Sequence, residues 1–256
     1  MNEARVVAGE LMDVGRQMND PRSTGLGLSL LTSVALVSDS YLEALEYSES
    51  SLAVAVTPID RSIALGGKGT ALILLRRVNE GLELLASYRR RCRANGELYA
   101  EAISDVTIAV CSVFQGNIGH GVRTIEAGIA KQDKDGYCAA AGWYRGFLAE
   151  IYLQILSRNE GLPFFTLLKN LPFLVKAMLK GSSYIRALMA HILENPRYDA
   201  AGLPVGRAQM ILGLLCRIEN KRTLANRYLT EARSIILRFG ETPMLTRVEA
   251  ALAALQ

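Results

Sequence analysis

Apolar residues recur at helical spacing along most of the chain, and residues 205–240 show the pattern most clearly. One apolar face runs through residues 211–216, and a second runs through residues 224–239. The polar residues Glu219, Asn220 and Lys221 separate the two faces. Apolar positions three and four residues apart lie on one side of a helix. The segment therefore predicts two antiparallel helices joined by a short turn.

Pairs of small residues mark the expected helix crossings, because helix axes approach closely only where the side chains between them are small. Each pair spans twelve positions, with a polar turn expected at 38–40, 77–79, 115–117 or 219–221. The pairs are Thr32 and Ala44, Gly69 and Gly81, Ala109 and Gly121, and Gly213 and Ala225. The second members of the first three pairs are 37 and then 40 residues apart, a period typical of helical repeats. We predict an all-α fold, a right-handed α-α superhelix built as a tetratricopeptide-like solenoid of antiparallel helix pairs with a C-terminal capping helix.

The repeats divide the chain into parts of a single helical domain. Residues 1–21 are expected to form an N-terminal helix or lead-in, residues 22–141 three repeats, and residues 205–240 the last repeat. Residues 241–256 read as a capping helix that starts at Thr242-Pro243. The pattern is disturbed over 142–204, where the segment 163–172 stands in place of a partner helix and residues 184–193 read as a further helix. We expect an elaborated or irregular repeat there.

Several stretches are similar to a known family. The phrases SDSYLEALEYSESSLAVAVTPIDRSIALGGKG, LLKNLPFLVKAML and GRAQMILGLL…LTEARSIILRFGETP resemble the C-terminal helical region of bacterial class III adenylate cyclase-like proteins, which carry cyclase and ATPase-like modules ahead of tetratricopeptide-like repeats. The resemblance covers most of the chain from Pro21 onward. It implies a regulatory or interaction region whose partners include the catalytic domains of a larger signalling protein. The chain matches no cyclase metal-binding or ATP-binding motif, so the resemblance implies no cyclase activity.

The composition narrows the classes of protein to be considered. Half of the 256 residues are hydrophobic and the mean hydropathy is +0.17, which excludes a disordered chain. The net charge of +4 is spread along the sequence and favours no nucleic acid partner. The densest basic cluster, residues 89–93, reads as a solvated helix end. Four isolated cysteines form no disulfide framework or zinc pattern, and the N-terminus shows no secretory signal, so cytoplasmic residence is expected.

We find no motif that indicates catalysis, a cofactor or a metal site. Residues 62–70, SIALGGKGT, invite comparison with a phosphate-binding loop, but the glycine and hydroxyl positions differ and no strand is expected before them. Helix packing is the better explanation for these glycines. His120 is expected at the surface or partly covered, and His191 on a helix flank. Cys111 and Cys216 lie on apolar faces and are expected to behave as small hydrophobic residues.

The repeat prediction favours a non-catalytic protein-interaction or regulatory module. Stacked helix pairs leave a concave surface lined by the first helix of each pair, which can bind a protein or peptide. The residues expected on this surface are Ser29, Ser33, Gly66, Thr70, Val106, Val110, Arg207, Met210 and Arg217. Arg207 and Arg217 are expected to point away from the partner helix, toward acidic groups of the ligand.

Two alternatives stay open. An enzyme with an unrecognised site is the less favoured one. The other is a peripheral membrane-surface module that uses residues 162–180, with Phe164, Phe165, Leu168, Phe173, Leu174 and Met178 beside Lys169, Lys176 and Lys180. Core packing of this segment is expected instead. The interrupting lysines and Pro172 exclude a transmembrane span.

Overall fold

The computed structural model describes residues 2–157, 164–199, 202–240 and 242–255, and every regular element in that part of the chain is a helix. The expected all-α repeat architecture is therefore confirmed. The helices are α1 (Asn2–Gln17), α2 (Pro21–Val37), α3 (Tyr41–Ala53), α4 (Pro58–Leu74), α5 (Val78–Asn95), α6 (Leu98–Phe114), α7 (Ile118–Lys134), α8 (Cys138–Ser157), α9 (Phe164–Leu193), α10 (Leu203–Ile218), α11 (Arg222–Ile236), the 3-10 turn η1 (Leu237–Phe239) and α12 (Pro243–Ala253).

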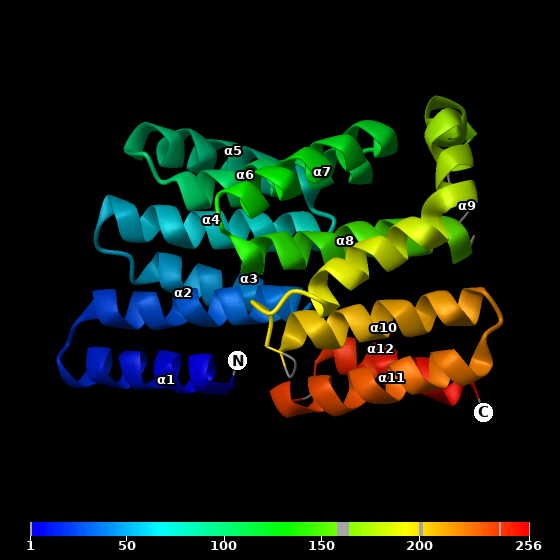
Figure 1. Ribbon diagram of the computed structural model, residues 1–256. Helices are drawn as coiled ribbons and strands as arrows, with labels where there is room; N and C mark the ends of the chain where they lie inside the picture. The colour runs from blue at the N-terminus through cyan, green and yellow to red at the C-terminus, as the bar shows by residue number, and fades with distance from the viewer. Residues whose placement is uncertain (1, 158–163, 200–201, 241, 256) are drawn as a thin grey trace. The chain divides into compact units, whose positions relative to one another are not determined.

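The helices form two compact units, Met1–Cys111 and Ser112–Gln256. In the first unit each of α1 to α4 packs against the next helix in the chain, and α2 also contacts α4 (Figure 1). In the second unit α8 packs against α7, α9 and α10, and α10 packs against α9, α11 and α12. Packing between consecutive helices is the arrangement that a repeat protein needs to build a continuous core.

One turn geometry joins most neighbouring helices. At seven turns in the described part of the chain, a residue with positive φ ends the helix, and the next residue donates its N–H to a carbonyl five positions earlier at 2.7–2.9 Å. The positive-φ residues are Asn19, Asp39, Arg76, Gly96, Gly116, Gly136 and Asn220. The turns expected at 38–40, 115–117 and 219–221 are confirmed. The turn expected at 77–79 lies earlier, because Arg76 takes the left-handed conformation and α5 already begins at Val78.

The small residues explain how closely some helices approach. A Cβ built on Gly81 would lie 2.7 Å from the carbonyl oxygen of Gly69, so this pair packs backbone against backbone. A Cβ on Gly213 would lie 2.6 Å from Cγ of Leu229, one turn beyond the fully buried Ala225. Both crossings therefore require the small residue that the sequence places there.

Two other pairs have different surroundings. Ala44 packs in a core cluster with Ala35 and Ala71, while Thr32 lies where it would meet a side chain at Gly67. Ala109 belongs to the first unit and Gly121 to the second.

The irregular region differs from its prediction. The structure places one helix, α9, across both the 163–172 segment and the expected separate helix at 184–193, with Pro172 inside it. Figure 1 shows α9 bent along its length, as expected for a helix in which proline removes a backbone hydrogen bond. Residues 162 and 163 lie outside the described residues.

The side chain of Asn170 fixes α9 to the turn between α6 and α7. Its Nδ2 donates to the carbonyl of Gly116 at 2.7 Å, and its Oδ1 accepts from the N–H of Gly119 at 3.1 Å. Asn170 is 5% exposed. The N-terminal half of α9 is therefore attached through a buried amide as well as through the buried side chains of Leu174 and Ala177.

The C-terminal helix begins as the sequence predicts. Thr242 accepts a hydrogen bond from the N–H of Leu245, and Pro243 occupies the first helical position. α12 then packs against α11 and α10 with Met244 and Val248 fully buried.

Candidate interaction surface on helix α9

The residues predicted to line a concave binding face are mostly inside the protein. Gly66, Thr70, Val106, Val110, Arg207 and Met210 are buried, Ser29 and Arg217 are half-buried, and Ser33 is exposed. The hydroxyl of Thr70 donates to the carbonyl of its own helix at Gly66, and Ser29 hydrogen-bonds Ser51. The buried members of this set hold helices together and present no side chain to solvent.

Arg207 is a structural residue, so the prediction that it faces a partner is wrong. It is 4% exposed, and its Nε and Nη2 donate to Oε1 of Glu150 at 3.1 and 2.9 Å. Oε2 of Glu150 lies 3.4 Å from Arg247. Gly146 leaves the space that the arginine stem occupies, since a Cβ there would lie 2.8 Å from Cδ of Arg207. The sequence missed this pair because its partners lie 57 residues apart.

The ion pair also sets the ionisation of Glu150. Burial opposes the charged carboxylate, but the guanidinium groups of Arg207 and Arg247 outweigh burial and lower the pKa of Glu150. This pairing holds α8, α10 and α12 together in the second unit.

The glycine-rich stretch on α4 has the packing role that the sequence indicates. A Cβ on Gly66 would lie 2.6 Å from the ring of Tyr88, and a Cβ on Gly67 would lie 2.8 Å from the methyl group of Thr32. His120 and His191 are exposed, as expected. Across the described ranges, no three His, Cys, Asp or Glu side chains gather in a way that could hold a metal ion.

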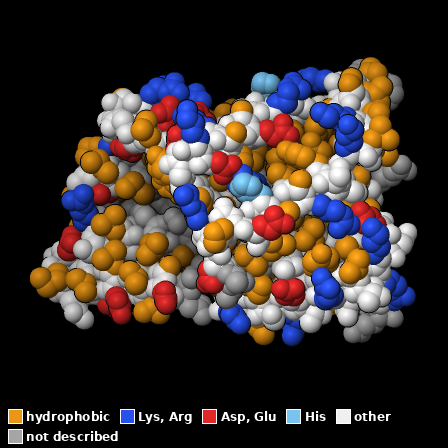
Figure 2. Space-filling model, viewed as in Figure 1, with side chains coloured by type: hydrophobic (Ala, Val, Ile, Leu, Met, Phe, Trp, Pro, Cys, Tyr) orange, Lys and Arg blue, Asp and Glu red, His pale blue; other side chains and the backbone are white. Residues whose placement is uncertain are grey.

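The N-terminal half of α9 exposes a row of large apolar side chains. Six large apolar side chains on successive turns are exposed, and we call them the α9 stripe. They are Leu167 (41% exposed), Leu168 (61%), Leu171 (52%), Val175 (49%), Met178 (45%) and Leu179 (80%). Figure 2 shows hydrophobic side chains gathered in this region, with basic side chains beside them. Isolated exposed leucines are ordinary, but a contiguous apolar patch indicates an interaction site.

The side of the helix next to the stripe carries the contacts that hold α9 in the second unit. Leu174 and Ala177 are buried there, with Asn170 in the same row. The expectation that segment 162–180 packs in the core is therefore wrong for the stripe and right for Leu174. The side chains of Phe164 and Phe165 lie outside the described residues.

The charges on α9 are of one sign. Lys169, Lys176 and Lys180 are exposed, and the sequence from Phe164 to Leu193 contains no Asp or Glu. Within the residues that the structure describes, no helix combines the length and apolarity needed to cross a bilayer.

The stripe has a sequence signal that could have identified it. Leu168, Leu171, Val175 and Met178 follow three-four-three spacing, and a second apolar row runs through Leu174 and Ala177. A helix with two apolar rows needs two partners, and the second unit supplies one.

Comparison of the sequence with family models and with curated proteins found no match.

Proposed function

We propose that this chain is a non-catalytic protein-interaction module whose second unit docks onto a partner through the α9 stripe. The observation that carries the proposal is the continuous exposure of six large apolar side chains on one side of a helix. Burying such a patch against a partner removes apolar surface from water, which is favourable by about 25 cal/mol per Å².

The spacing of the stripe favours a helix as the docking element. Leu168, Leu171, Val175 and Met178 stand at the a and d positions of a heptad pattern. Side chains at such positions insert between those of a facing helix. An amphipathic helix of another protein or domain is therefore the occupant that fits best.

The positive charge of α9 places a second requirement on the docking partner. Lys169, Lys176 and Lys180 are exposed beside the stripe, without an acidic residue on the helix to pair with them. Complementary potential steers association and disfavours wrong partners. The partner should therefore carry acidic side chains next to its apolar row. The resemblance to cyclase-like proteins suggests that such a partner belongs to the catalytic part of a larger signalling protein.

Photo-crosslinking tests this proposal. A photoreactive amino acid at Leu171 should give a defined adduct with another polypeptide in cells that contain the partner. Val175→Glu, one turn away, should abolish the adduct because a charge would be buried in an apolar interface. The matched control is the same photoreactive residue at Ser183, which is exposed on α9 outside the stripe.

The purified chain should neither turn over ATP nor make cyclic AMP.

The adducts also distinguish the alternatives. Adducts with lipid alone would mean that the stripe lies on a membrane surface, and an adduct with a second copy would mean self-association. Equal adducts from positions 171 and 183, or none from position 171, would contradict docking through the stripe.

A further inference from the structure

A pocket opens in the first unit between the start of α4 and the middle of α5. Its volume is about 160 Å³, below the roughly 300 Å³ at which pockets for drug-sized ligands begin. The lining residues are Pro58, Arg61, Ser62, Leu65, Ser87, Tyr88 and Arg91. None of them is acidic. The pocket therefore combines an apolar wall with cationic and hydroxyl groups in a space suited to a compact ligand.

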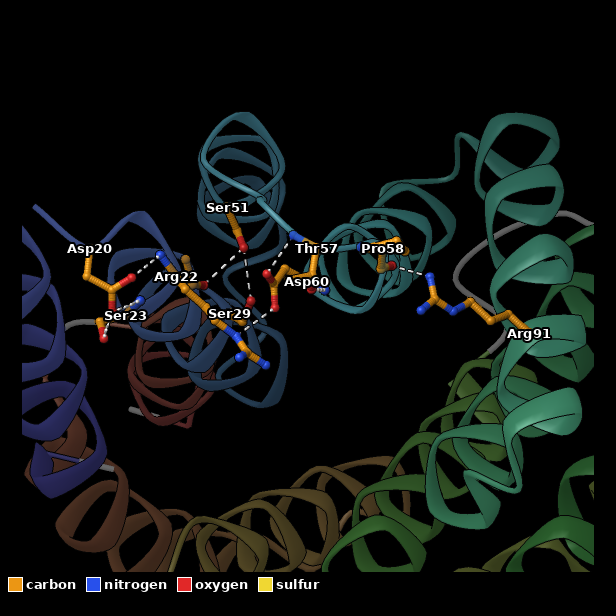
Figure 3. Close-up of polar contacts among 10 residues, drawn as sticks. Asp20, Arg22, Ser23, Ser29, Ser51, Thr57, Pro58, Asp60 and Arg91 are labelled. Carbon is orange, nitrogen blue, oxygen red and sulfur yellow. Dashed lines mark hydrogen bonds and ion pairs between the residues drawn. The ribbon is translucent and has the colours of Figure 1, made fainter.

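The arginine on α5 is already oriented at the edge of this pocket. Nη1 of Arg91 donates to the carbonyl oxygen of Pro58, the first residue of α4 (Figure 3). That bond uses one guanidinium nitrogen and leaves the others available. Arg61 lines the pocket from α4 and is exposed. In the described part of the chain neither arginine has a carboxylate partner.

Two of the neighbouring arginines on α5 have carboxylate partners, whereas Arg90 is exposed and does not line the pocket. Arg89 pairs with Asp105 and Arg93 pairs with Glu101. The basic cluster at 89–93 is therefore only partly the solvated helix end that the sequence suggests.

The nearest carboxylate at the start of α4 is also occupied. Asp60 accepts a hydrogen bond from the N–H of Thr57 at 2.9 Å and lies 3.4 Å from Nε of Arg22 (Figure 3). At the α5 side, Glu97 accepts from the amide of Asn95. Burial raises the pKa of Tyr88, the neighbouring Cys92 raises it further and Glu97 adds a smaller increase, while Arg91 lowers it. Positive charge on the pocket wall thus has no counter-ion among the lining side chains.

Ser62 places a hydroxyl at the wall of the pocket. The residue is 7% exposed, and it lines the pocket. Its Oγ is not among the fully buried polar atoms without a partner in the described residues, so water or a ligand can reach it.

We propose that this pocket binds a small anion that carries a phosphate group. Arg61 and Arg91 would pair with the phosphate oxygens, and the hydroxyls of Ser62 and Ser87 would donate to them. The ring of Tyr88, which lies over Gly66, and the side chains of Pro58 and Leu65 would contact a short organic part. This site rests on different residues from the α9 stripe and does not depend on the proposed function.

Isothermal titration calorimetry at constant ionic strength tests the site. The probes are inorganic phosphate, phenyl phosphate and acetate. Arg61→Gln should weaken phosphate binding about tenfold, or about 1.4 kcal/mol, because the variant loses a charge-assisted hydrogen bond to the ligand. Ser62→Ala should weaken it by a smaller factor. The matched control is Arg90→Gln, which removes the same charge from an exposed α5 residue that does not line the pocket.

Three outcomes would overturn the proposal. The first is the absence of a heat of binding at about 10 mM phosphate, because a Kd above this concentration would be weak even for a small ligand. The second is an Arg90→Gln variant that loses as much affinity as Arg61→Gln, because diffuse positive charge would then explain binding. The third is tighter binding of acetate than of phosphate, which would assign the pocket to carboxylates. Because Arg61 is exposed, its variant should keep the helical signal and melting temperature of the parent.

Discussion

At the residue scale, a left-handed backbone conformation recurs where helices end. Three of the seven turn residues with this conformation are glycines, three are Asn or Asp, and one is Arg76. A residue with a Cβ is strained at positive φ, and Asn and Asp tolerate it better than other side chains. The repeated choice of Gly, Asn and Asp is therefore a backbone requirement of the turns.

Gly136 allows that requirement to be measured. Its φ is +82°, and no atom lies within 4 Å of a Cβ built on it, so Gly136→Ala introduces conformational strain without a steric clash. We expect the free energy of unfolding to fall by about 1 kcal/mol. The matched control is Gly9→Ala inside α1, where a Cβ also meets nothing within 4 Å but φ is helical. The control should gain about 0.5–1 kcal/mol from helix propensity. If both variants changed the free energy of unfolding equally in urea denaturation, the claim that a Cβ is strained at position 136 would be contradicted.

At the element scale, the stability of each helix pair depends on how closely the axes approach. The crossing of α10 and α11 provides a test, since Gly213 faces Leu229 with no room for a side chain. Large residues at such a position push helices apart and leave voids around the contact.

Gly213→Leu should therefore destabilise the chain by roughly 1–3 kcal/mol, as overpacking forces side chains out of their rotamers. The measurement is the urea midpoint followed by circular dichroism. Thr230→Leu serves as the control, because Thr230 is exposed on α11 and tolerates a larger side chain. An unchanged midpoint for Gly213→Leu would mean that the crossing relaxes without cost.

At the scale of the whole molecule, carboxylates with lowered pKa values occur in both units. In the first unit, hydrogen bonds from Ser23 and the N–H of Arg22 lower the pKa of Asp20, and those from Thr57 lower that of Asp60. In the second, Arg207 and Arg247 lower the pKa of Glu150 against the effect of burial. A carboxylate with a lowered folded-state pKa stabilises the fold above its unfolded pKa of about 4, and that contribution disappears as the pH falls through the folded pKa.

We therefore expect these groups to give constant stability from about pH 5 to 7 and a loss below about pH 4, measured as the melting temperature against pH. Glu150→Gln should lose about 3 kcal/mol at neutral pH, because Arg207 would stay buried without a counter-charge, and it should show a flatter acid dependence. Glu80→Gln is the control, since Glu80 and Arg77 form an exposed pair that contributes little. A parent and a Glu150→Gln variant with parallel pH profiles would contradict this role.

Short-range patterns in the sequence are sufficient to predict much of the fold. Apolar periodicity, turn residues and helix-start signals act over one or two helical turns, so they identify most helices, three of the four predicted turns and the start of α12 at Thr242-Pro243. Gly69 and Gly81 were recognisable for the same reason, because a short turn forces residues at a fixed offset to face each other. The prediction for the segment around Pro172 is wrong, since proline usually ends a helix, while here α9 continues through it.

The candidate sites depend on contacts that no local pattern encodes. Burial is decided by all the elements that surround a residue, so Arg207 could not be separated from a surface arginine until Glu150, 57 residues away, was placed beside it. For the α9 stripe the sequence shows two apolar rows, but only the fold decides that the second unit covers the row with Leu174 and Ala177 and leaves the other exposed. Short-range backbone and packing preferences specify most of the helices and their turns, so these features can be predicted from the residues alone. Only the assembled fold settles which polar groups are buried and which apolar side chains stay exposed, because exposure depends on every element that surrounds a residue.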